Sequence, residues 1–204
     1  MNESENKQNE VKKSDKLSQK TAYKVLGEFF LDLAETFIIA IGLFIIIYNF
    51  LVQPNSVIGS SMEPNFEDGE YILTDRLSYR LREPKRGEVV VFKYPKDESL
   101  DYIKRIVALP GEKVLIENNT VTIFNDQNPE GYKLDEAYLD EYIDTQGGTI
   151  FPEGKETVVP KDAYFVMGDN RTRSSDSRSW GTVPKIDLIG RVIFRYWPFD
   201  KLGI

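Results

Sequence analysis

The chain has 204 residues, 41% of them hydrophobic and 29% charged, which is enough for one globular domain of moderate size with an appendage. It contains no histidine and no cysteine, so a Ser-His-Asp triad, a Cys-His pair, a histidine- or thiolate-ligated zinc site and disulfides are all excluded. The formal net charge is −7 and no run of Lys or Arg supplies a cationic face, which argues against a nucleic-acid partner.

The N-terminal region changes abruptly from polar to apolar. Its first residues are rich in Lys, Glu, Asn and Ser, a composition typical of a disordered tail. A nearly uninterrupted apolar run follows from Phe37 to Val52. A helix of about 20 residues ending there would span about 30 Å, which matches the hydrocarbon core of a bilayer. We therefore predict a tail over 1–28 and a transmembrane anchor over 29–53.

Lysines indicate the orientation of this anchor. Five lysines lie between residues 12 and 24, whereas nothing cationic occurs between Gln53 and Asp75. Because cationic flanks stay in the cytoplasm, we expect a cytoplasmic N-terminus and a single pass through the membrane. A cleaved signal peptide is the alternative, but the polar leader is long, contains acidic residues and is followed by no A-x-A pattern.

Beyond the anchor, short apolar runs separated by Gly and Pro predict a mainly β domain over 54–204, with a small inserted subregion at about 113–160. Asn118-Asn119, between two alternating runs, predicts a two-residue hairpin turn because Asn tolerates positive φ angles. The spacing of apolar residues from Leu134 to Tyr142 predicts one short helix. The predicted strands are Tyr71–Leu73, Glu88–Tyr94, Tyr102–Leu109, Lys113–Glu117, Thr120–Phe124, Thr157–Val159, Ala163–Met167 and Leu188–Tyr196.

Three stretches of this domain together carry the residue types of a hydrolase. They are Gly59 to Pro64, Tyr102 to Glu112 and Met167 to Arg178. The first contains Ser61, which follows closely on the apolar run. If Ser61 is a nucleophile, its base must be a carboxylate or a lysine of lowered pKa, because the chain has no histidine.

These stretches, together with Gly87 to Pro95 and Trp180 to Pro184, resemble bacterial type I signal peptidase. The resemblance covers the anchor and most of the outer domain. It implies a signal-peptidase-like antiparallel β-sheet catalytic domain preceded by a single N-terminal transmembrane helix. It also implies a membrane-bound serine endopeptidase that cuts signal peptides from exported preproteins after small residues, with its catalytic domain on the outer face of the bacterial cell membrane. Preproteins and the lipid bilayer are then its partners, and we expect neither a cofactor nor a metal.

By the same resemblance, Ser61 corresponds to the nucleophile and Lys104 to the general base of a Ser/Lys dyad. Lys104 lies among Ile103, Ile106 and Val107, and burial in such a strand would lower its pKa toward the useful range. Considered alone, a lysine on a strand is usually exposed and a serine before proline usually marks a turn.

The supporting residues are also assigned by resemblance. Ser174 corresponds to a second serine whose hydroxyl hydrogen-bonds the lysine amine and orients it. Gly168 is expected to let the backbone pass close to the dyad, because glycine has no side chain to obstruct it. Asp176 and Arg178 correspond to a supporting ion pair. The further positioning residues are Asp169 and Arg105.

One position departs from a pattern seen in some members of the family. They carry a serine two residues before the nucleophile, which donates its hydroxyl to the oxyanion, whereas this chain has Gly59. We therefore expect an oxyanion hole of backbone N–H groups that includes the N–H of Ser61. On this hypothesis Gly59→Ala costs little activity if φ permits it, and Gly59→Ser raises the rate.

Three alternatives accompany these predictions. Residues Tyr196 to Phe199, with Met62 and Phe66, form either an apolar rim resting on the bilayer or part of the core. A LexA-like self-cleaving protein also uses a Ser/Lys dyad, but it would bring a DNA-binding domain, for which the chain has no basic element. An inactive anchored domain that binds extracytoplasmic segments is the remaining alternative, and the presence of Ser61, Lys104 and Ser174 argues against it.

Overall fold

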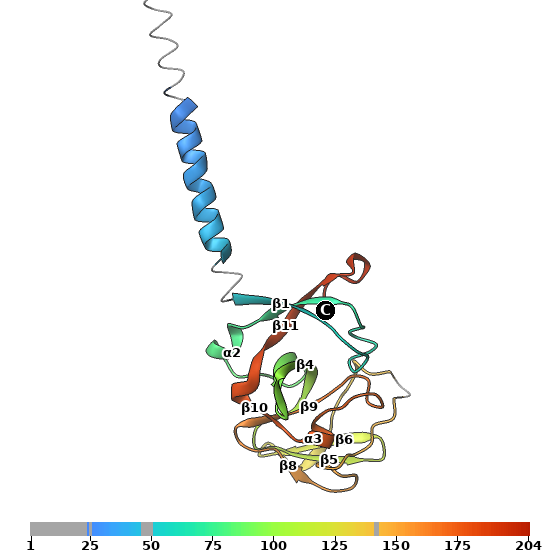
Figure 1. Cartoon of the computed structure of the whole chain (residues 1–204). Coiled ribbons are helices and arrows are strands. Elements are labelled where there is room, and N and C mark those ends of the chain that lie inside the picture. Colours follow the sequence, from blue (N-terminus) through green and yellow to red (C-terminus); the bar gives the residue numbers. More distant parts are fainter. Residues whose placement is uncertain (1–23, 25, 46–50, 141–142) are drawn as a thin grey trace, which may run out of the picture. The chain divides into compact units, whose positions relative to one another are not determined.

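The computed structural model divides the chain into two compact units, Met1–Tyr48 and Asn49–Ile204 (Figure 1). The residues that it describes are 24, 26–45, 51–140 and 143–204.

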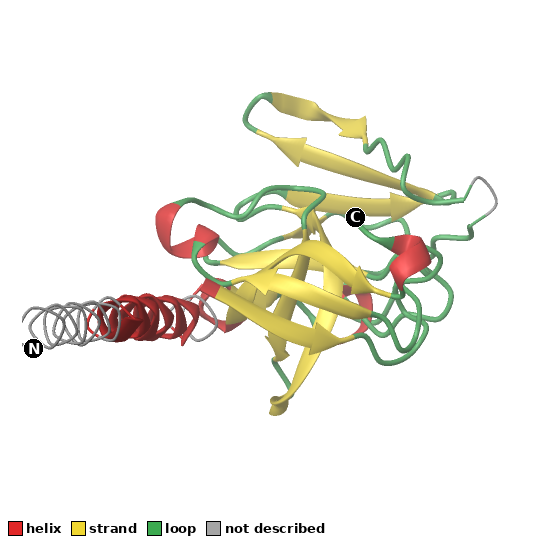
Figure 2. Ribbon diagram, turned by 90° about the horizontal axis from the view of Figure 1, so that it is seen from above, coloured by secondary structure: helices red, strands yellow, loops and turns green. Residues whose placement is uncertain are grey.

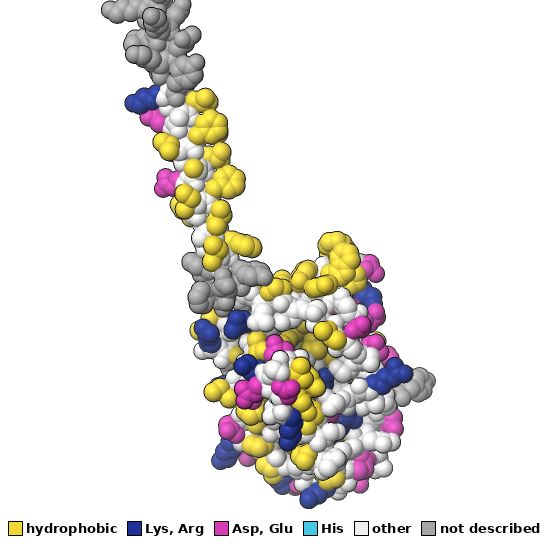
Figure 3. Space-filling model, viewed as in Figure 1, with side chains coloured by type: hydrophobic (Ala, Val, Ile, Leu, Met, Phe, Trp, Pro, Cys, Tyr) yellow, Lys and Arg dark blue, Asp and Glu magenta, His cyan; other side chains and the backbone are white. Residues whose placement is uncertain are grey.

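The first unit contains a helix over 26–45 whose large apolar side chains are exposed (Figure 3). Among the described residues, no helix is both long enough and apolar enough to cross a membrane. Residues 46–50, which belong to the predicted anchor, lie outside the described residues, as does most of the predicted tail.

The second unit is built from two antiparallel sheets. The strands of the larger sheet are β1 (Val52–Ser56), β2 (Tyr71–Asp75), β3 (Val89–Tyr94), β4 (Asp97–Ala108), β9 (Ala163–Met167), β10 (Val183–Pro184) and β11 (Leu188–Trp197). Those of the smaller sheet are β5 (Lys113–Glu117), β6 (Thr120–Asn125), β7 (Asn128–Lys133) and β8 (Thr157–Val158). Four short helices complete the unit, namely α2 (Ser78–Leu81), α3 (Ser177–Trp180), η2 (Lys185–Asp187) and η3 (Phe199–Lys201).

The strand order is β1-β2-β11-β3-β4-β9-β10 in the larger sheet and β7-β6-β5-β8 in the smaller one. All strand pairs among the described residues are antiparallel. Figure 2 shows the smaller sheet as a separate layer beside the larger one. The prediction of a mainly antiparallel β fold is therefore confirmed.

The larger sheet is covered on both faces, as β3 shows most clearly. Side chains alternate between the two faces of a strand. Val89 and Val91 pack in one hydrophobic cluster, while Val90 and Phe92 pack in another. A third cluster joins the two sheets through Val107, Ala108, Phe165 and Met167 of the larger sheet and Val114, Ile116, Val121 and Ile123 of the smaller one.

Two residues of the expected membrane rim belong to the core instead. Met62 is 0% exposed and Phe66 is 2% exposed, and both pack against β3 in the same cluster as Val89. Of the two alternatives, rim or core, the core therefore holds for these two residues, because the sheet buries them. Trp197 and Phe199 are exposed, and their rings pack edge to face.

Every strand predicted from apolar runs is present, with boundaries that differ by a few residues. The Asn118-Asn119 turn is also confirmed, since φ is 50° and 63° at the two residues. The sequence did not predict β1, β7 or β10, whose residues show little alternation of apolar and polar side chains. Hydrogen bonds from neighbouring strands, rather than a local pattern, hold these three segments in the sheets.

The predicted helix over Leu134–Tyr142 is wrong where the structure describes it. Residues 134–140 form turns without a helix, and 141–142 lie outside the described residues. Leu134 packs against the core cluster that joins the sheets, while Tyr138 donates a hydrogen bond to Glu136. Contacts with the rest of the domain therefore override the helical spacing.

Candidate active site

Ser61 lies on a turn that the core holds in place. The next residue, Met62, is fully buried, and its carbonyl accepts a hydrogen bond from the N–H of Phe66 at 2.9 Å. On the other side, the carbonyl of Ser61 accepts a hydrogen bond from the N–H of Asn170 at 3.1 Å. The turn is thus fixed both to the sheet and to the segment that follows β9.

Lys104 projects from β4 at the point where its partner strand ends. The pairing of β4 with β9 begins at Arg105, opposite Met167, and Lys104 comes just before it in sequence. The Nζ atom lies 2.6 Å from the Oγ atom of Ser61 and 2.8 Å from the carbonyl oxygen of Ile103. The structure therefore brings the two residues of the predicted dyad into hydrogen-bonding contact.

The environment of Lys104 favours the neutral amine. The residue is 3% exposed, and among the buried ionisable side chains of the described residues it alone has no ion-pair partner. Burial lowers the pKa of the Lys104 amine to about 8, although the negative charges of Asp176 and Asp169 act in the opposite direction. About a tenth of the amine is then neutral at pH 7 and able to accept a proton, far more than for an exposed lysine.

Gly168 and Ser174 lie next to the dyad. A Cβ atom on Gly168 would lie 2.2 Å from the Oγ of Ser174 and 2.3 Å from the carbonyl oxygen of Ser61, so no side chain fits there. The Oγ of Ser174 is buried and has no hydrogen-bond partner among the described residues. The bond expected between Ser174 and the Lys104 amine is thus not formed in this structure.

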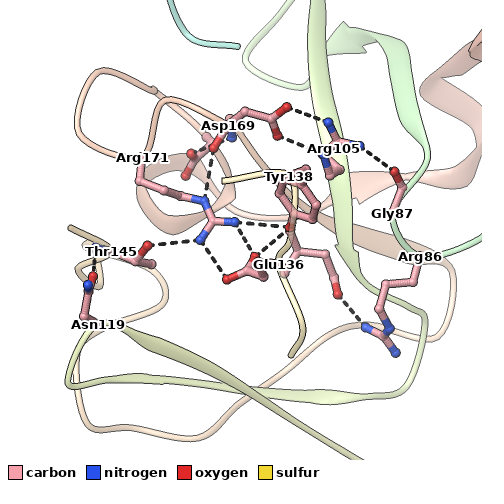
Figure 4. Close-up of polar contacts among 12 residues, drawn as sticks. Arg86, Gly87, Arg105, Asn119, Glu136, Tyr138, Thr145, Asp169 and Arg171 are labelled. Atoms are coloured by element: carbon pink, nitrogen blue, oxygen red, sulfur yellow. Dashed lines mark hydrogen bonds and ion pairs between the residues drawn. The ribbon is translucent and has the colours of Figure 1, made fainter. Parts of the chain in front are cut away.

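The half-buried Arg105 and the buried Asp169 form a two-pronged ion pair (Figure 4). Nε of Arg105 lies 2.9 Å from Oδ1 of Asp169, and Nη2 lies 2.6 Å from Oδ2. The guanidinium also stacks on the ring of Tyr138, with its central carbon 4.1 Å from the ring centroid. This pair joins β4 to the segment after β9, one residue beyond Lys104.

Asp176 and Arg178 form a second buried pair. Oδ1 of Asp176 accepts from Nε of Arg178 at 2.8 Å, and Oδ2 accepts from Nη2 at 2.9 Å. The same carboxylate accepts the N–H of Gly168 at 3.0 Å and caps the N-terminus of α3. Asp176 therefore connects the start of α3 to the glycine that lies against the dyad.

A cleft of about 460 Å³ opens beside Ser61 and Lys104. One wall is the segment from Asn55 to Ser61, and the other is the segment from Leu100 to Lys104. Among the described strands, β1 pairs only with β2, and β4 pairs with β9 only from Arg105 onward. Both walls therefore offer unpaired strand edges, to which an extended peptide can hydrogen-bond.

Comparison with known proteins identifies the family. The model of the family described as signal peptidase, peptidase S26, matches residues 30–197. The chain belongs to this signal peptidase family. Its members are serine endopeptidases, and so is this protein.

Individual signal peptidases resemble the chain over most of its length. Signal peptidase IB of Staphylococcus aureus strain Mu50 is 33% identical over 189 residues, which cover 87% of this chain and 93% of the relative. A probable signal peptidase I-2 of Synechocystis sp. is 36% identical over 179 residues, which cover 85% of this chain and 76% of the relative. A crystal structure of a signal peptidase I from Enterococcus faecalis V583 aligns with 54% of this chain and 97% of its own, at 28% identity and a TM-score of 0.43.

The structure of this signal peptidase family member adds residues that sequence analysis missed. Arg171 is buried and makes an ion pair with Glu136, and it also donates hydrogen bonds to Tyr138 and Thr145 (Figure 4). Its Nε atom donates to the carbonyl of Gly168 at 3.2 Å. Arg171 lies inside one of the motifs, but its side-chain partners are 26 to 35 residues away, so no local pattern points to them.

The backbone conformation of Gly59 decides whether this position tolerates a side chain. Its φ angle is +87°, a conformation that L side chains rarely adopt, and its N–H donates to Asp68 at 2.6 Å. The condition attached to Gly59→Ala is therefore not met, and the N–H of Gly59 already has an acceptor. Within the described part of the chain, the N–H of Ser61 has none, which leaves it available to an oxyanion.

Proposed function

We propose that this protein is a membrane-anchored signal peptidase that removes signal peptides from exported preproteins, with Ser61 as the nucleophile and Lys104 as the general base. The observation that carries the proposal is the 2.6 Å distance between the Nζ of the buried lysine and the Oγ of the serine. The names of the relatives in Staphylococcus aureus and Synechocystis support the substrate class.

The geometry supports acyl transfer with lysine in place of histidine. The neutral Lys104 amine accepts the hydroxyl proton as the Oγ of Ser61 attacks the scissile carbonyl. The N–H of Ser61 stabilises the oxyanion of the tetrahedral intermediate. The Lys104 ammonium then gives its proton to the leaving amine, and the neutral amine activates a water molecule that hydrolyses the acyl-enzyme.

The cleft supports binding of an extended substrate that has small side chains at the cut. A peptide lying between the two walls would hydrogen-bond to their open edges and bring a carbonyl to Ser61. Apolar side chains, among them Val57, Ile72 and Ile103, line the cleft. Such a lining favours apolar residues at the cut, and the small residues of an A-x-A-like site are what the family resemblance implies.

The apolar run before the β domain supports the membrane anchor. The predicted span 29–53 has the length needed for a bilayer, and its lysine-rich flank favours a cytoplasmic N-terminus. On this proposal, the catalytic domain faces the extracytoplasmic side of the bacterial membrane.

Cleavage by the purified full chain in detergent tests the proposal. The substrate is a preprotein with an A-x-A site, and its rate of cleavage is compared among wild type, Ser61→Ala and Lys104→Ala. A variant of an exposed lysine, Lys155→Ala, serves as a control. We expect both site variants to lose at least about 10³-fold in kcat/KM with their fold retained, and the control to cut like wild type. Continued cutting by Lys104→Ala would rule out lysine as the base, and a wild type that binds without cutting would favour an inactive binding domain.

A further inference from the structure

A second cavity, of about 280 Å³, lies between two parts of the β domain. One side is formed by α2 and the residue that follows β2, and the other by η2 and the start of β11. It shares no lining residue with the cleft at Ser61. Its lining includes Arg76, Arg80, Lys93 and Lys185, with Asp187 as the only acidic residue. A cavity with four cations and one carboxylate is unusual in a chain whose net charge is −7.

The two arginines of this group have no ion-pair partner among the described residues. Lys185 makes an ion pair with Glu83, with Nζ and Oε1 2.5 Å apart, and Lys93 is close enough to Asp187 to influence its titration. Among the residues that the structure describes, neither Arg76 nor Arg80 has a side-chain hydrogen bond or an ion pair. Guanidinium groups match the geometry of phosphate oxygens, which they bind with paired hydrogen bonds.

Exposed apolar side chains lie directly beside the cations. Leu81, which follows Arg80, is 77% exposed, and Ile186, which follows Lys185, is 91% exposed. Figure 3 shows Lys and Arg side chains gathered over α2 on the surface of the β domain, with apolar side chains among them. Cations next to exposed aliphatic groups are typical of surfaces that enter the headgroup region of a membrane, whereas a site for a free anion does not need them.

The cavity lies next to the point where the chain enters the β domain. The N–H of Arg76 donates to the carbonyl of Leu51 at 3.0 Å. If 29–53 spans the bilayer, as the proposed function holds, Leu51 lies at the outer boundary and Arg76 lies at the level of the lipid headgroups. We propose that the cavity binds the phosphate group of anionic phospholipids. Its position relative to the bilayer rests on the proposed anchor, but its affinity for the headgroup does not.

Calorimetric titration of the full chain in an uncharged detergent tests this inference. The probe is dihexanoyl phosphatidylglycerol below its critical micelle concentration. The double variant Arg76→Gln/Arg80→Gln is expected to bind about 25-fold more weakly than wild type, because each arginine near an anionic headgroup contributes about fivefold. Arg76→Lys/Arg80→Lys, which keeps both charges, should bind with intermediate affinity.

Matched controls separate a site from general charge effects. Lys155→Gln/Lys161→Gln removes two exposed positive charges elsewhere in the domain and should bind like wild type. The zwitterionic dihexanoyl phosphatidylcholine should bind at least about 25-fold more weakly than the phosphatidylglycerol. Equal affinity of wild type and the Gln double variant would overturn the inference, as would equal affinity for the two lipids. Inorganic phosphate that displaces the phosphatidylglycerol at an equal concentration would overturn the lipid assignment and make free phosphate the ligand. An acidic peptide that displaces it in the same way would make the ligand a protein.

Peptide cleavage by the same samples distinguishes this inference from the proposed function. Arg76 and Arg80 lie outside the cleft, so the Gln and the Lys double variants of these two arginines should cut a soluble peptide like wild type. A wild type that binds the lipid without cutting would count against the proposed function alone. A wild type that cuts but binds no lipid would count against the phospholipid site alone.

Discussion

Among the described residues of the β domain, Lys104 differs from the other buried Lys, Arg, Asp and Glu side chains in having no carboxylate or cation within ion-pair distance. Paired charges keep their ionised form in an interior, whereas an unpaired amine is more easily neutral. The nearest acidic groups, Asp169 and Asp176, are occupied by Arg105 and Arg178. This arrangement lets the fold hold carboxylates close to the lysine without holding it in the ammonium form.

The pH dependence of cleavage follows from the pKa of Lys104, which burial lowers to about 8. Because the base must be neutral to accept the serine proton, kcat/KM should rise about tenfold per pH unit below this value and level off above it. Cleavage of a short peptide between about pH 6 and 9.5 measures the profile. A rate still rising steeply at pH 9.5 would show that the lysine titrates near its usual value, and a flat profile would exclude it as the base.

Gly59 is constrained by its backbone rather than by its surroundings. Nothing lies within 4 Å of a Cβ atom built there, so the cost of a side chain comes from the φ angle of +87° alone. Stability should therefore fall in the order Gly, Asn, Ala, Val, because Asn tolerates positive φ and β-branched residues do not, with a cost of about 1–2 kcal/mol for Ala. Thermal unfolding of the three variants measures this order.

Gly59→Ser tests the hydroxyl contribution to the oxyanion in the same series. We expect it to lose stability like Gly59→Ala and to gain little rate, because the strained backbone would shift the added side chain and the turn before Ser61. A faster Gly59→Ser enzyme of unchanged stability would show that the turn accommodates a side-chain donor.

At the scale of elements, β4 combines three roles along its twelve residues. Its first half forms a wall of the cleft, Lys104 carries the base, and the residues from Ile106 onward belong to the core. The change of role coincides with the end of the pairing to β9. A strand paired with β3 up to Arg105, and with β9 from Arg105 onward, positions the lysine more rigidly than a loop would.

The segment after β9 depends on a buried charge network for its position. Arg171, at 2% exposed, holds Glu136 and the carbonyl of Gly168. Glu136→Gln would leave this arginine buried without a counter-charge, so we expect the domain to lose about 3 kcal/mol of unfolding free energy. Denaturant unfolding measures the loss.

The matched control for this substitution is Glu156→Gln in the exposed pair of Glu156 and Lys113. Its effect should stay within about 0.5 kcal/mol, because solvent screens exposed ion pairs. Similar effects of the two variants would show that the buried network does not hold the segment.

At the scale of the whole molecule, the proposal requires the tail and the β domain to lie on opposite sides of a membrane. The chain contains no cysteine, so single cysteines report topology without background. In intact cells a membrane-impermeant maleimide should label Lys155→Cys, whereas Ser4→Cys should react only after permeabilisation. Labelling of Ser4→Cys in intact cells would contradict the cytoplasmic tail.

The sequence alone determined the class of fold, the hairpin turn and the residue types available for catalysis. Apolar runs that alternate or are bounded by Gly and Pro predict strands because burial and turn chemistry act locally. The absence of histidine and cysteine excludes most hydrolase mechanisms whatever the fold. Motif resemblance then pointed to Ser61 and Lys104, to the ion pair of Asp176 and Arg178, and to Asp169 and Arg105 as positioning residues.

The tertiary structure decided what depends on distant segments. It brings Lys104 to Ser61 across 43 residues, joins Arg171 to Glu136, places Met62 in the core and keeps 134–140 out of a helix. It also sets the φ angle of Gly59, and it leaves the hydroxyl of Ser174 without a partner among the described residues. Burial, pKa and charge pairing are properties of the surroundings that folding creates, and local sequence does not contain them.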